Sequence, residues 1–142
     1  TAISLSEANL VLINFFRKSY NDLPSVTKDG NRANVWFTLS GASEKGKQII
    51  AGEYRYFPVD EDQFGTYPLR SPEDAYEELL SGNGYIANLG QNQDGKVTIR
   101  KIYLAYYDPH IVTEFYQPVI VFEGDRNFMA YVPAVTSDYY GN

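Results

Sequence analysis

The stretch "YPLRSPEDAYEELLSGNGYI" (67–86) contains one complete helix with its start and its stop encoded. Ser71 is a natural N-cap, because its hydroxyl oxygen can accept a hydrogen bond from a free N–H of the first turn, and Pro72 suits the first helical position. Gly82 readily adopts the left-handed conformation in which many helices end. The pattern predicts a helix over residues 72–81, which is too short to be stable alone.

The apolar side chains of this segment lie at helical spacing: Ala75, Tyr76, Leu79 and Leu80. A short helix with one apolar face must dock on something larger, and a sheet is the only candidate that the sequence offers. The segment carries no evident catalytic group. We therefore interpret it as a structural cover of a sheet.

A second helix is expected near the N-terminus, in "SLSEANLVLINFFRKSY" (4–20). Ser4 and Glu7 match the capping-box pattern, in which each side chain bonds the backbone N–H of the other residue. Apolar residues then recur at helical spacing: Leu5, Ala8, Leu12, Phe15 and Phe16. Pro24 disfavours helical geometry at the residue before it, so the helix should end upstream of this point.

Five segments have the alternation or the β-branched and aromatic content of strands: 33–39, 48–59, 97–107, 114–124 and 127–135. The first two should pair antiparallel across a polar loop. The apolar phase changes within 97–107, which predicts a β-bulge or a strand covered on both faces. The run "EGDRN" predicts a tight hairpin turn between the last two strands.

These elements predict an α+β fold, with an antiparallel sheet of about five strands and both helices on one of its faces. The order α-β-β-α-β-β-β suggests a single domain over 1–142 with an internal duplication of 1–60 and 67–135. A competing interpretation stays open, because well-capped helices resemble one another without common ancestry.

Composition narrows the functional classes. The chain has 142 residues, 44% of them hydrophobic and 15% aromatic, a net charge of −6 and no Cys. An acidic chain repels phosphate backbones, so we expect no nucleic-acid partner. Without Cys there are no disulfides, thiolate metal sites or Cys nucleophiles. No apolar run reaches the roughly 18 residues of a membrane span. We expect no metal and no cofactor.

Candidate catalytic groups do not form a pattern. The acidic stretch "DEDQFG" (60–65) resembles the start of a calcium loop, but Phe64 and Ser71 stand where that loop needs an oxygen ligand and a Glu. Carboxylates are plentiful, yet nothing places two of them across a cleft as glycoside hydrolysis requires. The single His110 lies in the turn-like segment "YYDPHIVTE". We therefore expect a protein that is not an enzyme.

The sheet face not needed for helix docking should carry aromatic and basic side chains, and we predict a binding surface there: Trp36, Arg55, Lys101, Tyr103, Tyr107 and Tyr131. The competing interpretation is a second core layer or a domain interface. A protein or an extended peptide would be the partner, since edge strands can also recruit a peptide as an added strand. The alternative function is a carbohydrate-binding module that uses exposed Tyr and Trp.

The helix and the strands after it resemble PepSY-type domains and the related extracytoplasmic YycH/YycI-type regulators of Gram-positive bacteria. The matching positions are Tyr67, Pro68, Leu69, Ser71, Ala75, Leu79, Gly82, Tyr103, Tyr106 and Tyr107, within 67–135. The resemblance implies a non-enzymatic, extracytoplasmic, regulatory or protein-binding domain of a bacterial membrane-anchored protein. The sequence begins with Thr1 rather than Met, so we expect a membrane link only through an upstream anchor absent from this chain.

Overall fold

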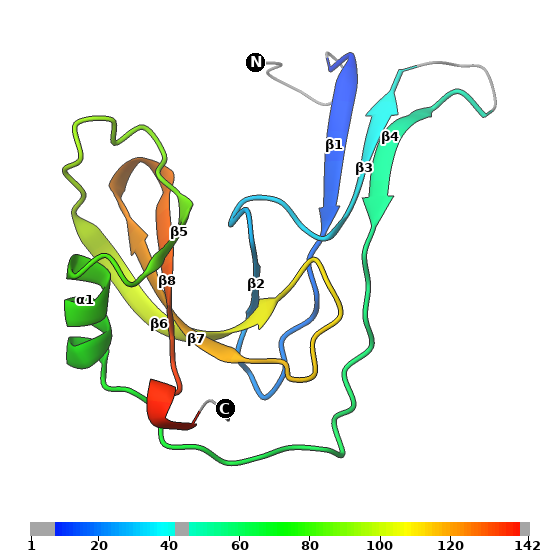
Figure 1. Cartoon of the computed structure of the whole chain (residues 1–142). Coiled ribbons are helices and arrows are strands. Elements are labelled where there is room, and N and C mark those ends of the chain that lie inside the picture. Colours follow the sequence, from blue (N-terminus) through cyan, green and yellow to red (C-terminus); the bar gives the residue numbers. More distant parts are fainter. Residues whose placement is uncertain (1–7, 42–45, 140–142) are drawn as a thin grey trace.

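The computed structural model describes residues 8–41 and 46–139, which contain eight strands and one α-helix (Figure 1). The strands are β1 (Leu10–Phe15), β2 (Ser25–Thr27), β3 (Val35–Ser40), β4 (Ile49–Tyr54), β5 (Tyr85–Asn88), β6 (Ile99–Asp108), β7 (Pro118–Gly124) and β8 (Phe128–Pro133). The helix is α1 (Pro72–Leu80), and two short 3-10 turns cover Asp125–Asn127 and Ser137–Tyr139.

The strands form two separate sheets. The first has the order β1-β3-β4 and is antiparallel throughout. The second has the order β2-β6-β7-β8-β5, with β2 parallel to β6 and the other pairs antiparallel. In Figure 1 the three-stranded sheet projects from the body that the second sheet and α1 form. The predicted α+β class, with one sheet and two helices on one face, is therefore wrong, and the molecule is mostly β.

The predicted helix over 4–20 is the main error. Residues 10–15 form strand β1, and the capping box of Ser4 and Glu7 lies outside the described residues. The run "LVLINFF" is apolar at nearly every position, so it matches helical spacing by coincidence, while its β-branched and aromatic residues favour a strand. Pairing of β1 with β3 supplies its backbone hydrogen bonds. The duplication loses its basis, because the described first half contains no helix.

The second predicted helix is confirmed, over Pro72–Leu80. The Ser71 side chain accepts a hydrogen bond from the Asp74 N–H at 3.1 Å, and Pro72 occupies the first helical turn. Gly82 follows with φ +82°, in the left-handed region that ends helices. The helix packs on β8 and fully buries its own Ala75 there, but Leu80 is 69% exposed.

The strand predictions hold for all five segments, with shifted ends. The predicted bulge is present as a register shift between Ile99 and Lys101, and the turn between β7 and β8 places Arg126 and Asn127 at positive φ. Strands β2 and β5 were not predicted. Both are short, and each lies at an edge of the five-stranded sheet, so neither carries a long alternating pattern.

The five-stranded sheet curls into a half-barrel whose two edges approach each other. The Tyr131 hydroxyl on β8 donates to the backbone oxygen of Thr27 on β2 at 3.0 Å. Tyr85 on β5 donates in the same way to the Lys28 oxygen at 3.3 Å. A Cβ on Gly30, which follows β2, would lie 3.7 Å from Ala87 of β5. Side chains therefore bridge the gap that strand pairing leaves open.

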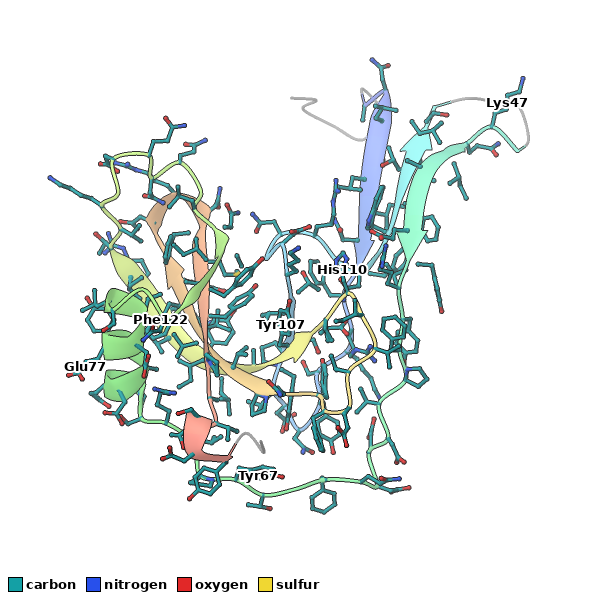
Figure 2. All side chains as sticks on the ribbon, in the orientation of Figure 1. Lys47, Tyr67, Glu77, Tyr107, His110 and Phe122 are labelled. Carbon is teal, nitrogen blue, oxygen red and sulfur yellow. The ribbon has the colours of Figure 1, made fainter. Side chains whose placement is uncertain are left out.

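The half-barrel has a core on each face. The outer core lies under α1 and centres on Phe122, with Ala75, Ile120 and Val132 around it (Figure 2). The inner core fills the curl of the sheet, where Val26, Ala105, Val119, Val121 and Tyr131 meet Tyr103 and Tyr107. The face that we expected to be open is thus a second core layer, because a strongly curled sheet buries its concave face against itself.

The tyrosines of this molecule make its stability sensitive to alkali. Burial is the main cause that raises the pKa of five phenols above 10.0: Tyr103, Tyr106, Tyr107, Tyr116 and Tyr131. The unfolded chain would lose these protons near pH 10, whereas the folded chain keeps them. Their contribution to stability is fully present below about pH 10 and is lost as the pH rises above it.

We expect the urea midpoint of unfolding to fall steeply above about pH 10 and to change little between about pH 7 and pH 9. Near-ultraviolet absorbance of phenolate provides the second measurement, since the buried tyrosines should ionise only together with unfolding. A urea midpoint that stays constant up to about pH 11 would contradict this assignment.

Candidate functional site

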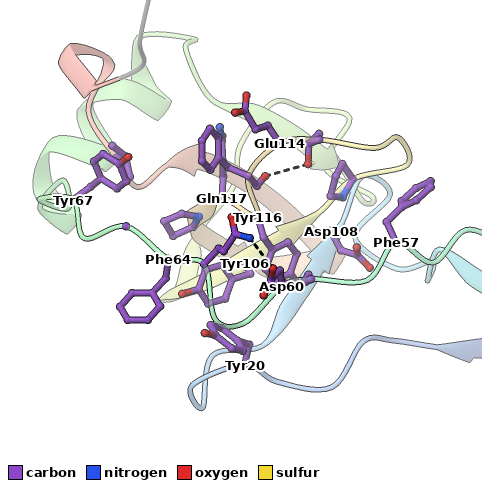
Figure 3. Close-up of a pocket in the computed structure, with 18 of the residues that line it drawn as sticks. Tyr20, Phe57, Asp60, Phe64, Tyr67, Tyr106, Asp108, Glu114, Tyr116 and Gln117 are labelled. Carbon is purple, nitrogen blue, oxygen red and sulfur yellow. Dashed lines mark hydrogen bonds between the residues drawn. The ribbon is translucent and has the colours of Figure 1, made fainter.

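A large cleft lies between the linker that follows β4 and the loop that follows β6. Its volume is about 820 Å³, and its walls come from residues 57–69, from 109–117 and from the ends of β6 and β7 (Figure 3). The linker runs in an extended path from the three-stranded sheet to α1 (Figure 1). The cleft therefore lies beside the path that links the projecting sheet to the body.

A column of aromatic rings with one guanidinium forms part of the wall of this region, with Arg17, Tyr20, Tyr106 and Tyr116 lining the cleft. Tyr106 and Tyr116 stack in parallel, with centroids 4.9 Å apart and an angle of 10°. Tyr20 meets Tyr106 edge-on at 5.5 Å. The Arg17 guanidinium lies 5.5 Å from the Tyr116 ring and 4.5 Å from the Tyr56 ring. The column ties together residues 17–20, Tyr56 and residues 106–116, three regions that are far apart in the sequence.

Arg17 is the anchor of this column. Its side chain is only 9% exposed, as is that of Asp108, with which it forms an ion pair at 3.0 Å. It also donates to the Phe57 carbonyl oxygen at 2.8 Å. Burial opposes its charge, but the hydrogen bond and ion pair with Asp108 outweigh that effect and raise the pKa of Arg17. The Nε atom is buried without a hydrogen-bond partner in the described structure.

Asp108 also connects the two sheets. Its backbone oxygen accepts a hydrogen bond at 2.8 Å from the side-chain amide of Asn34, which is 2% exposed and precedes β3. Arg55, which follows β4, donates to the carbonyl oxygen of His110 in the loop that follows β6, at 3.4 Å. The end of β6 is therefore the joint at which the projecting sheet meets the half-barrel.

The outer part of the cleft exposes apolar side chains to solvent. Phe64 on the linker is 81% exposed, and Ile111 and Phe115 on the facing loop are 66% and 60% exposed. Tyr67 contacts Tyr139 edge-on, with centroids 6.4 Å apart. Apolar groups of this size at the mouth of a cleft are typical of a binding site, because burial by a ligand would remove them from water.

The six residues predicted to bind do not line this cleft, and the structure does not bring them together on one face. Tyr103, Tyr107 and Tyr131 belong to the inner core of the half-barrel, and Figure 2 shows Tyr107 within the curl of the sheet. Tyr103 donates to Glu123. Lys101 is exposed, with its ammonium 4.5 Å from the Tyr103 ring.

Trp36 and Arg55 belong to the three-stranded sheet and its exit. The Trp36 indole N–H donates to Glu53 at 3.1 Å, and the Arg32 guanidinium lies 4.6 Å from its ring. Arg55 pairs with the same Glu53. These hydrogen bonds with Arg55 and Trp36 lower the pKa of Glu53. The residues thus form a local polar cluster, which contacts the half-barrel through the hydrogen bond from Arg55 to the His110 oxygen.

Sequence reasoning missed the cleft because its walls are loops, which have no periodic pattern. One signal was available: the segments "YFPVDEDQFGTYP" (56–68) and "EFYQP" (114–118) combine aromatic residues with Pro, although the strand predictions for 48–59 and 114–124 included part of each. Aromatic residues in irregular segments often serve either a local core or a binding surface. Here they do both, since some rings build the column and others remain exposed.

Two further properties of the described residues are relevant to the site. They contain no group of three or more His, Cys, Asp or Glu side chains placed to hold a metal ion. None of their helices is long and apolar enough to cross a membrane.

Comparisons with known proteins identify no relative for this arrangement. No protein-family model, no curated protein and no solved structure matches the chain.

Proposed function

We propose that the chain is a non-enzymatic protein-binding domain that holds an extended segment of a partner protein in the cleft between 57–69 and 109–117. The observation that carries this proposal is the exposure of Phe64, Ile111 and Phe115 at the mouth of a cleft of about 820 Å³. That volume lies within the roughly 300–1,000 Å³ of typical ligand sites.

The backbone of the linker supports an extended ligand. Residues 57–67 make no backbone–backbone hydrogen bond with any other described residue. The Phe57 oxygen accepts from Arg17 and the Asp62 N–H donates to the Asp60 side chain. An extended peptide beside this linker could pair with other backbone N–H and C=O groups of the linker while its side chains enter the cleft. This mode gives affinity through the main chain and selectivity through the exposed apolar groups.

A carbohydrate ligand has weaker support. Sugar-binding platforms present open faces of Tyr or Trp, whereas Tyr106, Tyr116 and Tyr20 are engaged with one another in the column. Tyr67 and Tyr139 also line the cleft and are about half exposed, but they pack edge-on against each other. The most exposed side chains at the mouth, those of Phe64, Ile111 and Phe115, suit apolar peptide side chains better than hydroxylated rings. The extracytoplasmic location and the upstream anchor stay predictions.

The test uses a displayed library of short random peptides and the whole chain as bait. We expect selected peptides to be rich in apolar residues and to bind in the micromolar range. The Phe115→Ala variant should bind them at least about tenfold more weakly, which is about 1.4 kcal/mol.

Val112→Ala is the matched control for this variant. Val112 lies on the same loop and is 74% exposed, but it does not line the cleft. Its truncation should leave affinity unchanged. If no peptide is enriched, or if both variants lose affinity equally, the cleft is not the binding site; selective binding of oligosaccharides would favour the alternative function.

A further inference from the structure

The three-stranded sheet has one face without any charged or strongly polar side chain. In an antiparallel pair, residues directly opposite each other share a face. The register places Val35, Phe37 and Leu39 of β3 on one face, and Trp36 and Thr38 on the other. We call the face with Val35, Phe37 and Leu39 the apolar face.

The neighbouring strands extend this pattern on both sides. Val11, Ile13 and Phe15 of β1 lie opposite Leu39, Phe37 and Val35. On β4 the partners of the same three residues are Ile49, Gly52 and Tyr54. The apolar face is therefore an array of three rows with three positions each, and its most polar atom is the Tyr54 hydroxyl.

This face is not covered by the rest of the described chain. Phe15 is 54% exposed, Ile49 61% and Tyr54 72%, and no residue of the three strands is buried. Gly52 adds to its flatness, because a Cβ there would come within 2.5 Å of the Phe37 ring, which lies over the bare backbone. A comparable apolar face on the half-barrel is covered by α1, as Phe122 shows.

The opposite face of the same sheet has a different character. It carries Asn14, Trp36 and Glu53 near the body, where Arg32 and Arg55 add charges. Farther from the body it carries the exposed Leu10 and Leu12, paired with the polar Ser40 and Thr38. This face therefore mixes charged, polar and apolar side chains, whereas the apolar face has no charged side chain at any position.

We propose that the apolar face packs against the same face of a second copy of this chain, so that two three-stranded sheets form a sandwich about a two-fold axis. Two sheets that pack in this way lie about 10 Å apart with their side chains interdigitated. An isologous contact needs a surface that is complementary to itself, and an array of apolar side chains without charges meets that requirement.

Charge favours this occupant over a charged partner. The chain has a net charge of −6, so two copies repel unless the contact avoids acidic groups. The apolar face contains none, and Glu53 points to the opposite face. Contact through this face therefore buries no charge and brings no two carboxylates together.

The size of the apolar face determines the affinity that we expect for the dimer. The face has nine residue positions, fewer than the roughly 20–30 residues on each side of a standard interface. The dimer should therefore be weak, with a dissociation constant in the micromolar range, and sedimentation equilibrium from about 1 to 200 µM covers that range. The wild-type chain should shift from 16.1 kDa to twice that mass over the series.

Two matched variants separate the faces. Ile49→Glu places a carboxylate on the apolar face, and Leu10→Glu places one on the opposite face; the wild-type side chains are 61% and 58% exposed. Both residues lie on edge strands of the sheet. We expect Ile49→Glu to raise the dissociation constant by about 100-fold or more, because the two-fold symmetric interface would bury one new carboxylate from each copy. Leu10→Glu should change the dissociation constant less than about threefold, because its carboxylate stays outside the interface.

Circular dichroism and the urea midpoint of each variant at low concentration confirm that the monomer stays folded. A wild-type chain that remains monomeric at all concentrations overturns the proposal and leaves the face to a different protein. Equal dissociation by both variants would show pairing through strand edges and would also overturn it. A dimer that persists in Ile49→Glu has the same consequence. None of these outcomes depends on peptide binding in the cleft.

Discussion

Replacement of Arg17 by Met should lower the free energy of unfolding by about 3–5 kcal/mol. Met keeps most of the aliphatic volume but removes the guanidinium, which leaves the Asp108 carboxylate buried at 9% exposure without its cation. The hydrogen bond to the Phe57 oxygen and the contacts with the Tyr56 and Tyr116 rings are lost as well. Urea unfolding near neutral pH measures the loss.

Arg100→Met is the control for this variant. Arg100 pairs with Asp125 through two hydrogen bonds of 2.7 and 2.8 Å, but its side chain is 65% exposed. Solvent screens such a pair, so its removal should cost far less stability than the removal of the buried Arg17. In an Asp108→Asn background, Arg17→Met should cost clearly less than in the wild type, since no buried carboxylate remains. Equal losses for Arg17→Met and Arg100→Met would contradict the assigned role.

The second large effect is expected at the outer core of the half-barrel. Phe122→Ala should lower the free energy of unfolding by about 3–5 kcal/mol. The Phe122 ring is 0% exposed and lies 6.3 Å from the Tyr76 ring of α1, between the helix and the sheet. Its removal leaves a cavity between α1 and the sheet. Thermal and urea unfolding both measure the effect.

The control for this variant is Phe64→Ala, which truncates a linker side chain of the same type that is 81% exposed. We expect a change within about 0.5 kcal/mol for this variant. A Phe122→Ala variant that loses no more stability than Phe64→Ala would mean that α1 does not cover the sheet as described. The pair therefore tests the packing of the helix independently of the cleft.

The helix α1 and most of the strands could be predicted from the sequence. Ser71, Pro72 and Gly82 act through bonds and dihedral angles within a few residues, so local pattern suffices to place both ends of the helix. Alternation in β3 has the same local origin, and the register confirms that Val35 and Phe37 share a face. Local signals of this kind need no knowledge of the rest of the chain.

The segment 10–15 shows that a local pattern can be insufficient to predict the secondary structure. Its residues are apolar at nearly every position, so both the helical and the extended conformation offer an apolar face. Pairing with β3, which starts twenty residues later, decides between them. The partition of the strands into two sheets, and the curl that buries Tyr103, Tyr107 and Tyr131, have the same non-local cause.

The candidate sites follow from tertiary structure alone. Arg17 and Asp108 are separated by 91 positions, and nothing near either residue indicates the other. The cleft forms because two irregular segments meet beside the ion pair of Arg17 and Asp108. Irregular segments have no periodic pattern of apolar residues from which the cleft could be predicted. Sequence by itself determined the capped helix, the strand-forming segments and the acidic, Cys-free surface chemistry. Only the three-dimensional packing decided which faces are buried, because burial depends on contacts between residues that are distant in the chain.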